Sequence, residues 1–455
     1  MSLLAADIND AGITVLNEDA VLYREPGFAL LEDDGLTTGN SAFLYARVKP
    51  RRIHDHYWSN LRTDPLPDQR FRHLSAADLV NRQLEQIRDK VAGHGDRMVV
   101  AVPPYMNNDN LGLFLGICNE VGLPVIALID AAVAATRRQY TNASPVHVDI
   151  SLHSALLTRV GQSGQAQVEK NAVVEASGLI ALYEAWMRTI SDAFVQQSRF
   201  DPLHTAESEQ MLLNHIPRWL DAAAGGGTVE LQMEYSGLSH KAELDALVLI
   251  AAAAPVYQRI VSQLRALYRA DETPAIQLTD RAARMPGLAD MLKARIGGEV
   301  FLLESTATAR GLLSRCRDLQ AGDSRMSLVR KLPWDQVPVS VQASSASSAG
   351  GRPTHMLLDD TAYPIDDRPL NLGTQMVAGE RWVDLQQDMP GVSRRHCALQ
   401  MENGQCVVRD FSRYGTFLNG HKMDGSAVLQ TGDLIRLGTP GYELRLIATE
   451  HDSGT

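Results

Sequence analysis

The pattern of hydrophobic and polar residues predicts a mixed α/β body over residues 1–330. Apolar runs at 3–7 and 97–102 are typical of buried strands, whereas residues 76–91 and 111–121 have helical periodicity. Strands that alternate with helices in this way indicate a sheet covered by helices. Further strands are expected at 13–16, 124–129, 146–150, 155–160, 275–279 and 299–303, and long helices at 176–197 and 241–268.

The body shows the same opening pattern twice. A strand that ends near Asp7 leads through a short turn to a second strand, and a similar pair of strands surrounds Asp149. Such repetition predicts an internal duplication of α/β units.

Residues 356–450 have a different pattern, which predicts an all-β sandwich. The runs 397–401 and 405–410 alternate as strands do, and Asn403-Gly404 between them is a strong hairpin signal. The loops at one end of such a sandwich are expected to form a cationic, hydroxyl-bearing rim, and Arg and hydroxyl donors suit a phosphate dianion. The expected rim residues are Ser393, Arg394, Arg395, Arg413 and Asn419.

Residues 331–355 are expected to be a flexible linker between the two parts, because the stretch 341–352 is rich in Ser, Ala and Gly.

Composition narrows the possible functions. The chain has 455 residues, of which 45% are hydrophobic and 21% charged, as in a globular protein of two to four domains. A net charge of −11 argues against nucleic acid as the main partner. The four cysteines lack metal-ligand spacing and are expected to be buried, small hydrophobic residues. With neither a signal-peptide pattern nor an apolar run of membrane length, we expect a cytoplasmic protein without membrane contact.

The segments 392–398, 407–420 and 429–438 together resemble a forkhead-associated (FHA) domain. The resemblance implies that Ser393 contacts a phosphothreonine and that His396 braces the loop from beneath. It also implies phosphopeptide-binding roles for Arg394, Arg395, Arg413, Thr416 and Asn419, and structural roles for Gly373 and Gly415.

Two usual peptide contacts of that family are replaced here. Thr374 follows Gly373 where the family has an Arg on the phosphate, and Tyr414 stands where it has an Asn on the peptide backbone. Two interpretations therefore stay open: binding of phosphothreonine, or an FHA scaffold that binds an unphosphorylated partner or another part of its own chain.

The segments 100–108 and 121–135 are similar to corresponding parts of Hsp70 ATPase domains, in the right order along the chain. This resemblance implies an actin/Hsp70-like body of two lobes, built from a duplicated ribonuclease H-like unit, with ATP and magnesium bound between the lobes. Asp7 and Asp149 stand where the family uses acids for magnesium or its waters.

The residues expected to cradle phosphate depart from the family pattern. Backbone N–H groups approach phosphate most closely at glycines. Asn9 stands where the first hairpin of the family has Gly, the second hairpin has lost its three glycines, and Asp280 and Arg281 replace the glycine pair of the adenosine site. Phe43 stands near the place of the catalytic lysine, and Ala131 and Ala132 replace Glu and Pro of the connecting segment. The degenerate site is expected to comprise Asp7, Asn9, Asp149, Ser151, Asp280 and Arg281, with Asp10, Leu152 and His153 crowding it. We therefore expect no ATP or magnesium cofactor and no catalysis.

Other candidate chemistry is sparse. His54, Asp55 and His56 could hold a metal, but a polar surface loop is the better interpretation because no second ligand cluster accompanies them. His147 and His153 are interpreted as structural histidines. No metal site is predicted.

These observations favour a cytoplasmic adaptor with an inactive Hsp70-like body and an FHA domain that binds a threonine-containing protein segment. An Hsp70-type or actin-like protein is a plausible partner by analogy alone. The alternative is a divergent ATPase that its FHA domain recruits to phosphorylated targets.

Overall fold

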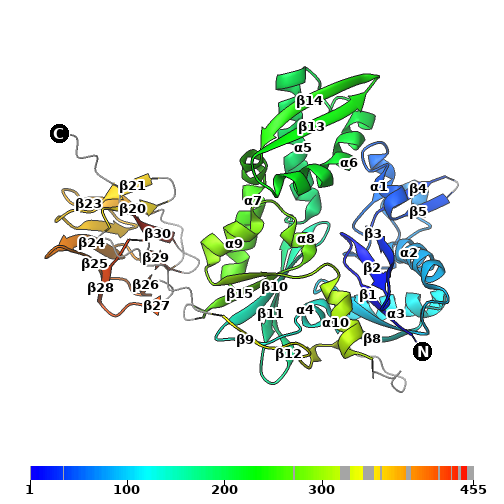
Figure 1. Ribbon diagram of the computed structural model, residues 1–455, viewed down its shortest axis with the longest axis horizontal. Coiled ribbons are helices and arrows are strands. Elements are labelled where there is room, and N and C mark those ends of the chain that lie inside the picture. Colours follow the sequence, from blue (N-terminus) through cyan, green and yellow to red (C-terminus); the bar gives the residue numbers. More distant parts are fainter. Residues whose placement is uncertain are drawn as a thin grey trace. The chain divides into compact units, whose positions relative to one another are not determined.

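A computed structural model describes residues 2–33, 35–269, 272–317, 328–341, 353–358, 361–385, 391–418, 421–431, 433–438 and 442–447. The chain divides into a larger unit, Met1–Gln263 with Ala275–Ser340, and a smaller one, Leu264–Pro274 with Val341–Thr455. Each unit is described by itself below, and Figure 1 labels their elements.

The first sheet of the larger unit has the strand order β17-β8-β7-β1-β2-β3. Strands β1, β2 and β3 are antiparallel neighbours, and β7 and β8 continue from β1 in parallel. The bounds are β1 Leu3–Asp7, β2 Ile13–Leu16, β3 Val21–Glu25, β7 Arg97–Val102, β8 Val125–Asp130 and β17 Leu328–Val329.

Strand β1 is buried on both faces, which explains its continuous apolar sequence. Leu4 and Ala6 face a core that includes helices α2 (Ala76–Val91) and α3 (Asn108–Val121). Leu3 and Ala5 face a second core with α4 (Ala131–Ala135) and α10 (Ala307–Arg315). Because alternate side chains of a strand point to opposite faces, β1 contributes to a core on each side of the sheet.

The second sheet has the order β16-β15-β10-β11-β12-β18. Again three consecutive strands, β10 to β12, are antiparallel, and two parallel strands, β15 and β16, lie beyond the first of them. Apart from the edge strands β17 and β18, which lie at opposite ends, the five other strands of each sheet follow the same order, as the predicted internal repeat requires. The bounds are β10 Ser144–Ile150, β11 Ser154–Gly161, β12 Ala166–Glu175, β15 Pro274–Leu278, β16 Glu299–Leu302 and β18 Lys331–Leu332.

A subdomain of helices and one hairpin follows β12. It contains α5 (Leu179–Ser198), α6 (Ala206–Ala223) and the strands β13 (Thr228–Tyr235) and β14 (Leu238–Asp245). The predicted helix at 241–268 is wrong in its first part, because 241–245 pairs with β13 in the hairpin. The turn at Ser236-Gly237, both with positive φ, fixes that pairing, and the helix α7 starts only at Ala246.

Helix α7 (Ala246–Arg265) is apolar and long enough to cross a membrane by length and composition alone. Packing inside the unit gives a different reason for that composition. Leu249, Ala253, Tyr257 and Ile260 are buried at helical spacing, and the Tyr257 hydroxyl donates to the Pro286 carbonyl at 2.9 Å. The apolar stripe is therefore a core face of the helix.

The smaller unit contains two packed β-sheets of orders β21-β20-β30-β29-β26-β27 and β23-β22-β24-β25-β28. Their inner faces share one core, to which Met356, Leu372, Leu399 and Leu444 belong. The predicted mixed α/β body and C-terminal β-sandwich are thus confirmed. The bounds are β20 His355–Leu358, β21 Thr361–Pro364, β22 Leu370–Gly373, β23 Arg381–Asp384, β24 Cys397–Glu402, β25 Gln405–Asp410, β26 Thr416–Leu418, β27 His421–Lys422, β28 Ser426–Leu429, β29 Leu434–Leu437 and β30 Tyr442–Ile447.

The start of the predicted linker differs from expectation. Leu332 of β18 pairs with Ala166, and β19 (Val339–Ser340) pairs with β9 (Tyr140–Thr141), so residues 331–340 are tied to the larger unit. The Ser-rich residues 342–352 lie outside the described residues. All four cysteines are buried and free, as expected.

Candidate functional site

A buried charged centre lies between the two sheets of the larger unit. Asp7 ends β1, Asp149 lies at the corresponding place in β10, and Arg281 belongs to the short helix α8 (Asp280–Ala283). The Arg281 Nη2 donates to Asp7 Oδ2 at 2.9 Å and to Asp149 Oδ2 at 2.7 Å, while its Nε donates to Asp149 Oδ1 at 3.1 Å. One guanidinium thus bridges both carboxylates.

Neighbouring side chains complete this network. The Asn9 amide donates to Asp149 Oδ2 at 2.8 Å and to the Ile150 carbonyl at 3.1 Å, and the Thr279 hydroxyl also donates to Asp149. Asn9 and Asp149 are 140 residues apart in sequence, so these bonds connect the first sheet with the second.

The pKa values follow from burial and from the guanidinium. Burial alone would raise the pKa of Asp149, but the charge and hydrogen bonds of Arg281 outweigh it and lower that pKa to about 2. At Asp7 burial is the larger influence and raises the pKa, although Arg281 opposes the rise. Asp149 is therefore the firmly ionised partner of Arg281.

The N–H groups of Ser151 and Leu152, in the turn between β10 and β11, are engaged in hydrogen bonds within the protein. The Leu152 N–H donates to Asp10 Oδ1 at 2.8 Å, and Ser151 donates through both its N–H and its hydroxyl to the Ser154 carbonyl. Burial raises the pKa of Asp10 to about 6. The backbone donors that a phosphate would need are already engaged, and an acid lies beside them.

A cavity of about 340 Å³ adjoins the charged centre. Asp7, Gly12, Thr279, Asp280 and Arg281 form its polar side. Phe43, the residue near the expected lysine position, also lines the cavity, edge to face with Phe28 at a ring distance of 5.1 Å. At this position the cavity offers a ligand an aromatic ring instead of a lysine.

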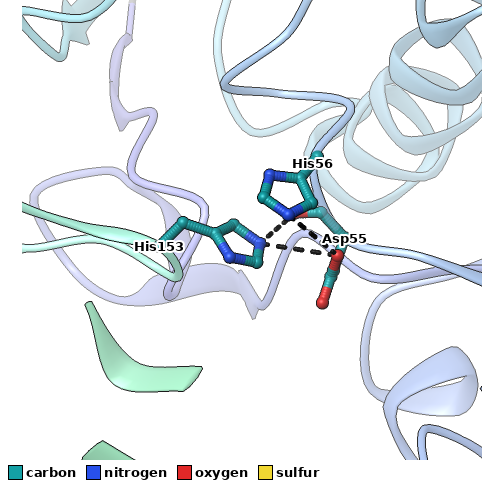
Figure 2. A group of neighbouring side chains, drawn as sticks. All are labelled: Asp55, His56 and His153. Atoms are coloured by element: carbon teal, nitrogen blue, oxygen red, sulfur yellow. Dashed lines mark hydrogen bonds and ion pairs between the residues drawn. The ribbon is translucent and has the colours of Figure 1, made fainter. Parts of the chain in front are cut away.

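A second polar cluster joins two segments far apart in sequence. The Asp55 Oδ1 lies 3.4 Å from His153 Nε2 and 3.9 Å from His56 Nε2, and the two rings stack with centroids 3.4 Å apart (Figure 2). The structure thus supplies the second ligand source that the sequence argument against a metal lacked. His54 is not part of this group.

Three loops meet at one end of the C-terminal sandwich. Ser393 precedes β24, and its hydroxyl accepts the Arg413 N–H from the loop after β25 at 3.1 Å. Thr374, just after β22, donates its N–H to the Ser393 carbonyl at 3.3 Å. His396 is fully buried beneath these loops: its Nδ1 accepts the Ser393 N–H at 3.0 Å, and its Nε2 lies 3.4 Å from the Gly415 carbonyl.

Four cationic side chains surround this end. Arg394, Arg395 and Arg413 are exposed. Lys422, which was not among the residues predicted from the sequence, lies over Gly415: a Cβ on that glycine would approach the Lys422 Cε to 2.3 Å. Among the described residues, no carboxylate pairs with Arg394, Arg413 or Lys422. We call these four the cationic rim.

The family model of the FHA domain matches residues 374–438. The expected FHA domain is confirmed. No curated protein matches the chain.

Two glycines of the FHA domain are required, one by close packing against backbone and the other by its positive φ. A Cβ on Gly373 would lie 2.0 Å from the Arg394 carbonyl oxygen, and Gly415 has φ of +98° with Lys422 above it. Thr416 is fully buried and donates its hydroxyl to Asp410 at 2.9 Å, so it holds the FHA loop and does not face the cationic rim. Asn419 lies outside the described residues.

Arg395 is partly engaged within the FHA domain. Its Nε donates to Asn371 Oδ1 at 3.2 Å, and its guanidinium lies 4.6 Å from the Phe411 ring centre. Arg394, Arg413 and Lys422 are therefore the rim cations best placed for a ligand. Lys422 could not be found by motif, because it lies on β27, outside the motif residues.

Proposed function

We propose that this protein is a cytoplasmic adaptor whose FHA domain binds a threonine-phosphorylated protein segment and whose α/β body is an actin/Hsp70-like fold without nucleotide chemistry. The bridge from Arg281 to both Asp7 and Asp149 carries the second half of this proposal. The FHA domain suggests phosphothreonine-containing partners.

The strand order supports the actin/Hsp70-like assignment. Each sheet has three antiparallel strands followed by two parallel ones, and the two acids lie at corresponding places in the two sheets. This is the arrangement expected of a duplicated ribonuclease H-like unit with its site between the lobes.

The charges of the centre, and the position of Arg281 between its two acids, argue against ATP binding there. A magnesium ion bound by Asp7 and Asp149 would have to displace Arg281, which is held by both acids in the interior. Removing one partner of a buried ion pair costs about 3–5 kcal/mol, because it leaves an uncompensated charge. A triphosphate would in addition meet Asp10 and a turn whose N–H groups are already bonded.

The cationic rim supports phosphate binding despite Thr374 in the usual Arg position. A charge-assisted hydrogen bond is worth about 1.5–3 kcal/mol. Lys422 adds a cation beside the loops that carry Ser393 and Arg413, so it can supply part of the missing charge. The net charge of −11 keeps nucleic acid an unfavourable alternative, and a protein partner, of Hsp70 or actin type by analogy, remains our proposal.

The cavity beside Arg281 favours one alternative. Its volume of about 340 Å³ is enough for a small ligand, and Arg24 and Arg284 are among its lining residues. A divergent nucleotide-binding protein would use this cavity with contacts unlike those of its relatives.

Binding of a phosphothreonine peptide library to the full chain tests the adaptor proposal. We expect enrichment of phosphorylated over unphosphorylated peptides and weaker binding by Lys422→Ala and Arg394→Ala. Arg409→Ala is the matched control, since this exposed arginine pairs with Glu402 on strand β24. Equal retention of both libraries would refute phosphate recognition and leave the FHA domain as a docking scaffold.

A further inference from the structure

We propose that Asp55, His56 and His153 bind a divalent transition-metal ion, with Zn²⁺ the best match. The three side chains each present one ligand atom, and these atoms all lie within 4.8 Å of one another. Asp55 and His56 follow β6 (Ile53–His54), whereas His153 lies in the turn after β10.

The spacing of the ligand atoms fits a tetrahedral ion. Zinc bonds to His nitrogen and carboxylate oxygen at about 2.0–2.2 Å, so two ligand atoms of one tetrahedron lie about 3.3–3.6 Å apart. The observed separations from Asp55 Oδ1 are 3.4 Å to His153 and 3.9 Å to His56. The Asp55–His56 separation therefore has to shorten by only a few tenths of an ångström to match the spacing of two zinc ligands.

The donor set selects the class of metal. Two imidazoles with one carboxylate suit zinc and neighbouring transition metals, whereas magnesium and calcium prefer sites made of oxygen alone. Three protein ligands leave the fourth position of a tetrahedral ion open to water. Water can reach the cluster, because the His56 side chain is 63% exposed.

The backbone at His153 is fixed before any ion arrives. The His153 carbonyl accepts the Ser177 N–H at 3.2 Å, and a Cβ on Gly178 would lie 2.5 Å from the His153 backbone, so no larger residue fits there. The His153 ring also reaches the Asp55 carbonyl oxygen, 3.2 Å from Nε2. One ligand is thus presented by a rigid turn.

His56 is the ligand that must adjust. An ion lies in the plane of each imidazole that binds it, and the two rings here are nearly parallel, with 14° between their planes. Figure 2 shows both rings beside the Asp55 carboxylate, so rotation of the exposed His56 ring opens the stack around an ion. The bound ion would then link the segment after β6 to the β10–β11 turn, independently of any nucleotide or FHA ligand.

Zinc titration of the metal-free full chain tests this site. We expect one Zn²⁺ per chain by calorimetry and by elemental analysis after dialysis. His56→Ala and His153→Ala should each weaken binding by more than about 100-fold, the upper range for loss of a mere outer-shell partner. His94→Ala is the control, since His94 is exposed and outside the cluster, and it should bind zinc as the unchanged protein does.

Two readouts keep the test decisive. If His153→Ala does not fold, the exposed His56→Ala still reports on the site. In NMR spectra of the histidine rings, zinc should shift the ring signals of His56 and His153 and leave those of His94 unchanged. Absence of stoichiometric zinc, or binding that survives His56→Ala or is lost in His94→Ala, would overturn the proposal.

Discussion

The charged centre of the body and the cationic rim of the FHA domain both contain basic side chains, but they use them in opposite ways. The Arg281 side chain is partly buried, and its charge is met by two buried carboxylates of the same chain. Arg394, Arg413 and Lys422 are exposed, and no carboxylate among the described residues meets them. A charge satisfied within the fold stabilises that fold, whereas a cluster of unsatisfied charges remains available to a ligand.

The largest effect is expected when the ion pairs of the charged centre are removed. Arg281→Ala should lower the free energy of unfolding by about 3–5 kcal/mol, because it leaves two buried acids without their shared partner. Chemical denaturation measures the change. Arg284→Ala is the control, since its side chain is 60% exposed and 3.9 Å from Asp280, and it should change stability by less than about 0.5 kcal/mol. A loss below about 1 kcal/mol for Arg281→Ala would contradict a structural role for the bridge.

A pH titration sharpens the same contrast. His147 is buried in β10 near Asp149 and Arg281, and burial lowers its pKa to about 4. Between the ordinary histidine value of about 6.5 and that lowered value, the unfolded state binds more protons, so stability falls as the pH falls through this window. The expected loss is up to about 3 kcal/mol by pH 4.

The His147→Asn variant should lose this part of the pH dependence, as measured by denaturation at several pH values. His94→Asn, at an exposed position, should retain it. An unchanged slope in His147→Asn would show that His147 is not the titrating group.

At the rim, Arg394→Ala and Lys422→Ala should weaken phosphopeptide binding by about 1.5–3 kcal/mol each. They should leave the free energy of unfolding nearly unchanged, because these side chains are exposed. Fluorescence anisotropy and denaturation of the same variants give both quantities. If the variants lost stability but kept their affinity for the phosphopeptide, the rim cations would stabilise the fold, as Arg281 does, and would not bind a ligand.

The smallest effect concerns Thr374. Thr374→Arg should tighten phosphopeptide binding by about 1 kcal/mol, since Thr374 adjoins Ser393 through a backbone hydrogen bond. Thr374→Gln serves as a control of similar length without charge. Equal affinities of the two variants would show that this position does not reach the phosphate.

The sequence predicted much of the fold for identifiable reasons. Helix α2 was predicted at its observed bounds, because its apolar spacing is regular and Ser75 caps it with Asp78. Residues 241–245 form a hairpin strand but were predicted as helix. This short run directly precedes a long apolar helix, and it is too short to show a strand periodicity of its own.

The site could be predicted only where a local motif marks it. Ser393 and His396 belong to such a motif, and the structure places both at the meeting of three FHA loops. By contrast, Asp55 and His153 are 98 residues apart, and Lys422 reaches the rim through packing over Gly415. Contacts of this kind follow from tertiary structure, which no local pattern reports.

Titration of the full chain with ATP and magnesium, followed by thermal unfolding, tests the central claim most directly. A ligand at 100 times its dissociation constant stabilises a protein by about 2.7 kcal/mol, so binding would be evident. We predict no shift and no hydrolysis above a blank, because Arg281 already satisfies Asp7 and Asp149. Saturable stabilisation at micromolar ATP, abolished by Asp7→Ala, would contradict the account.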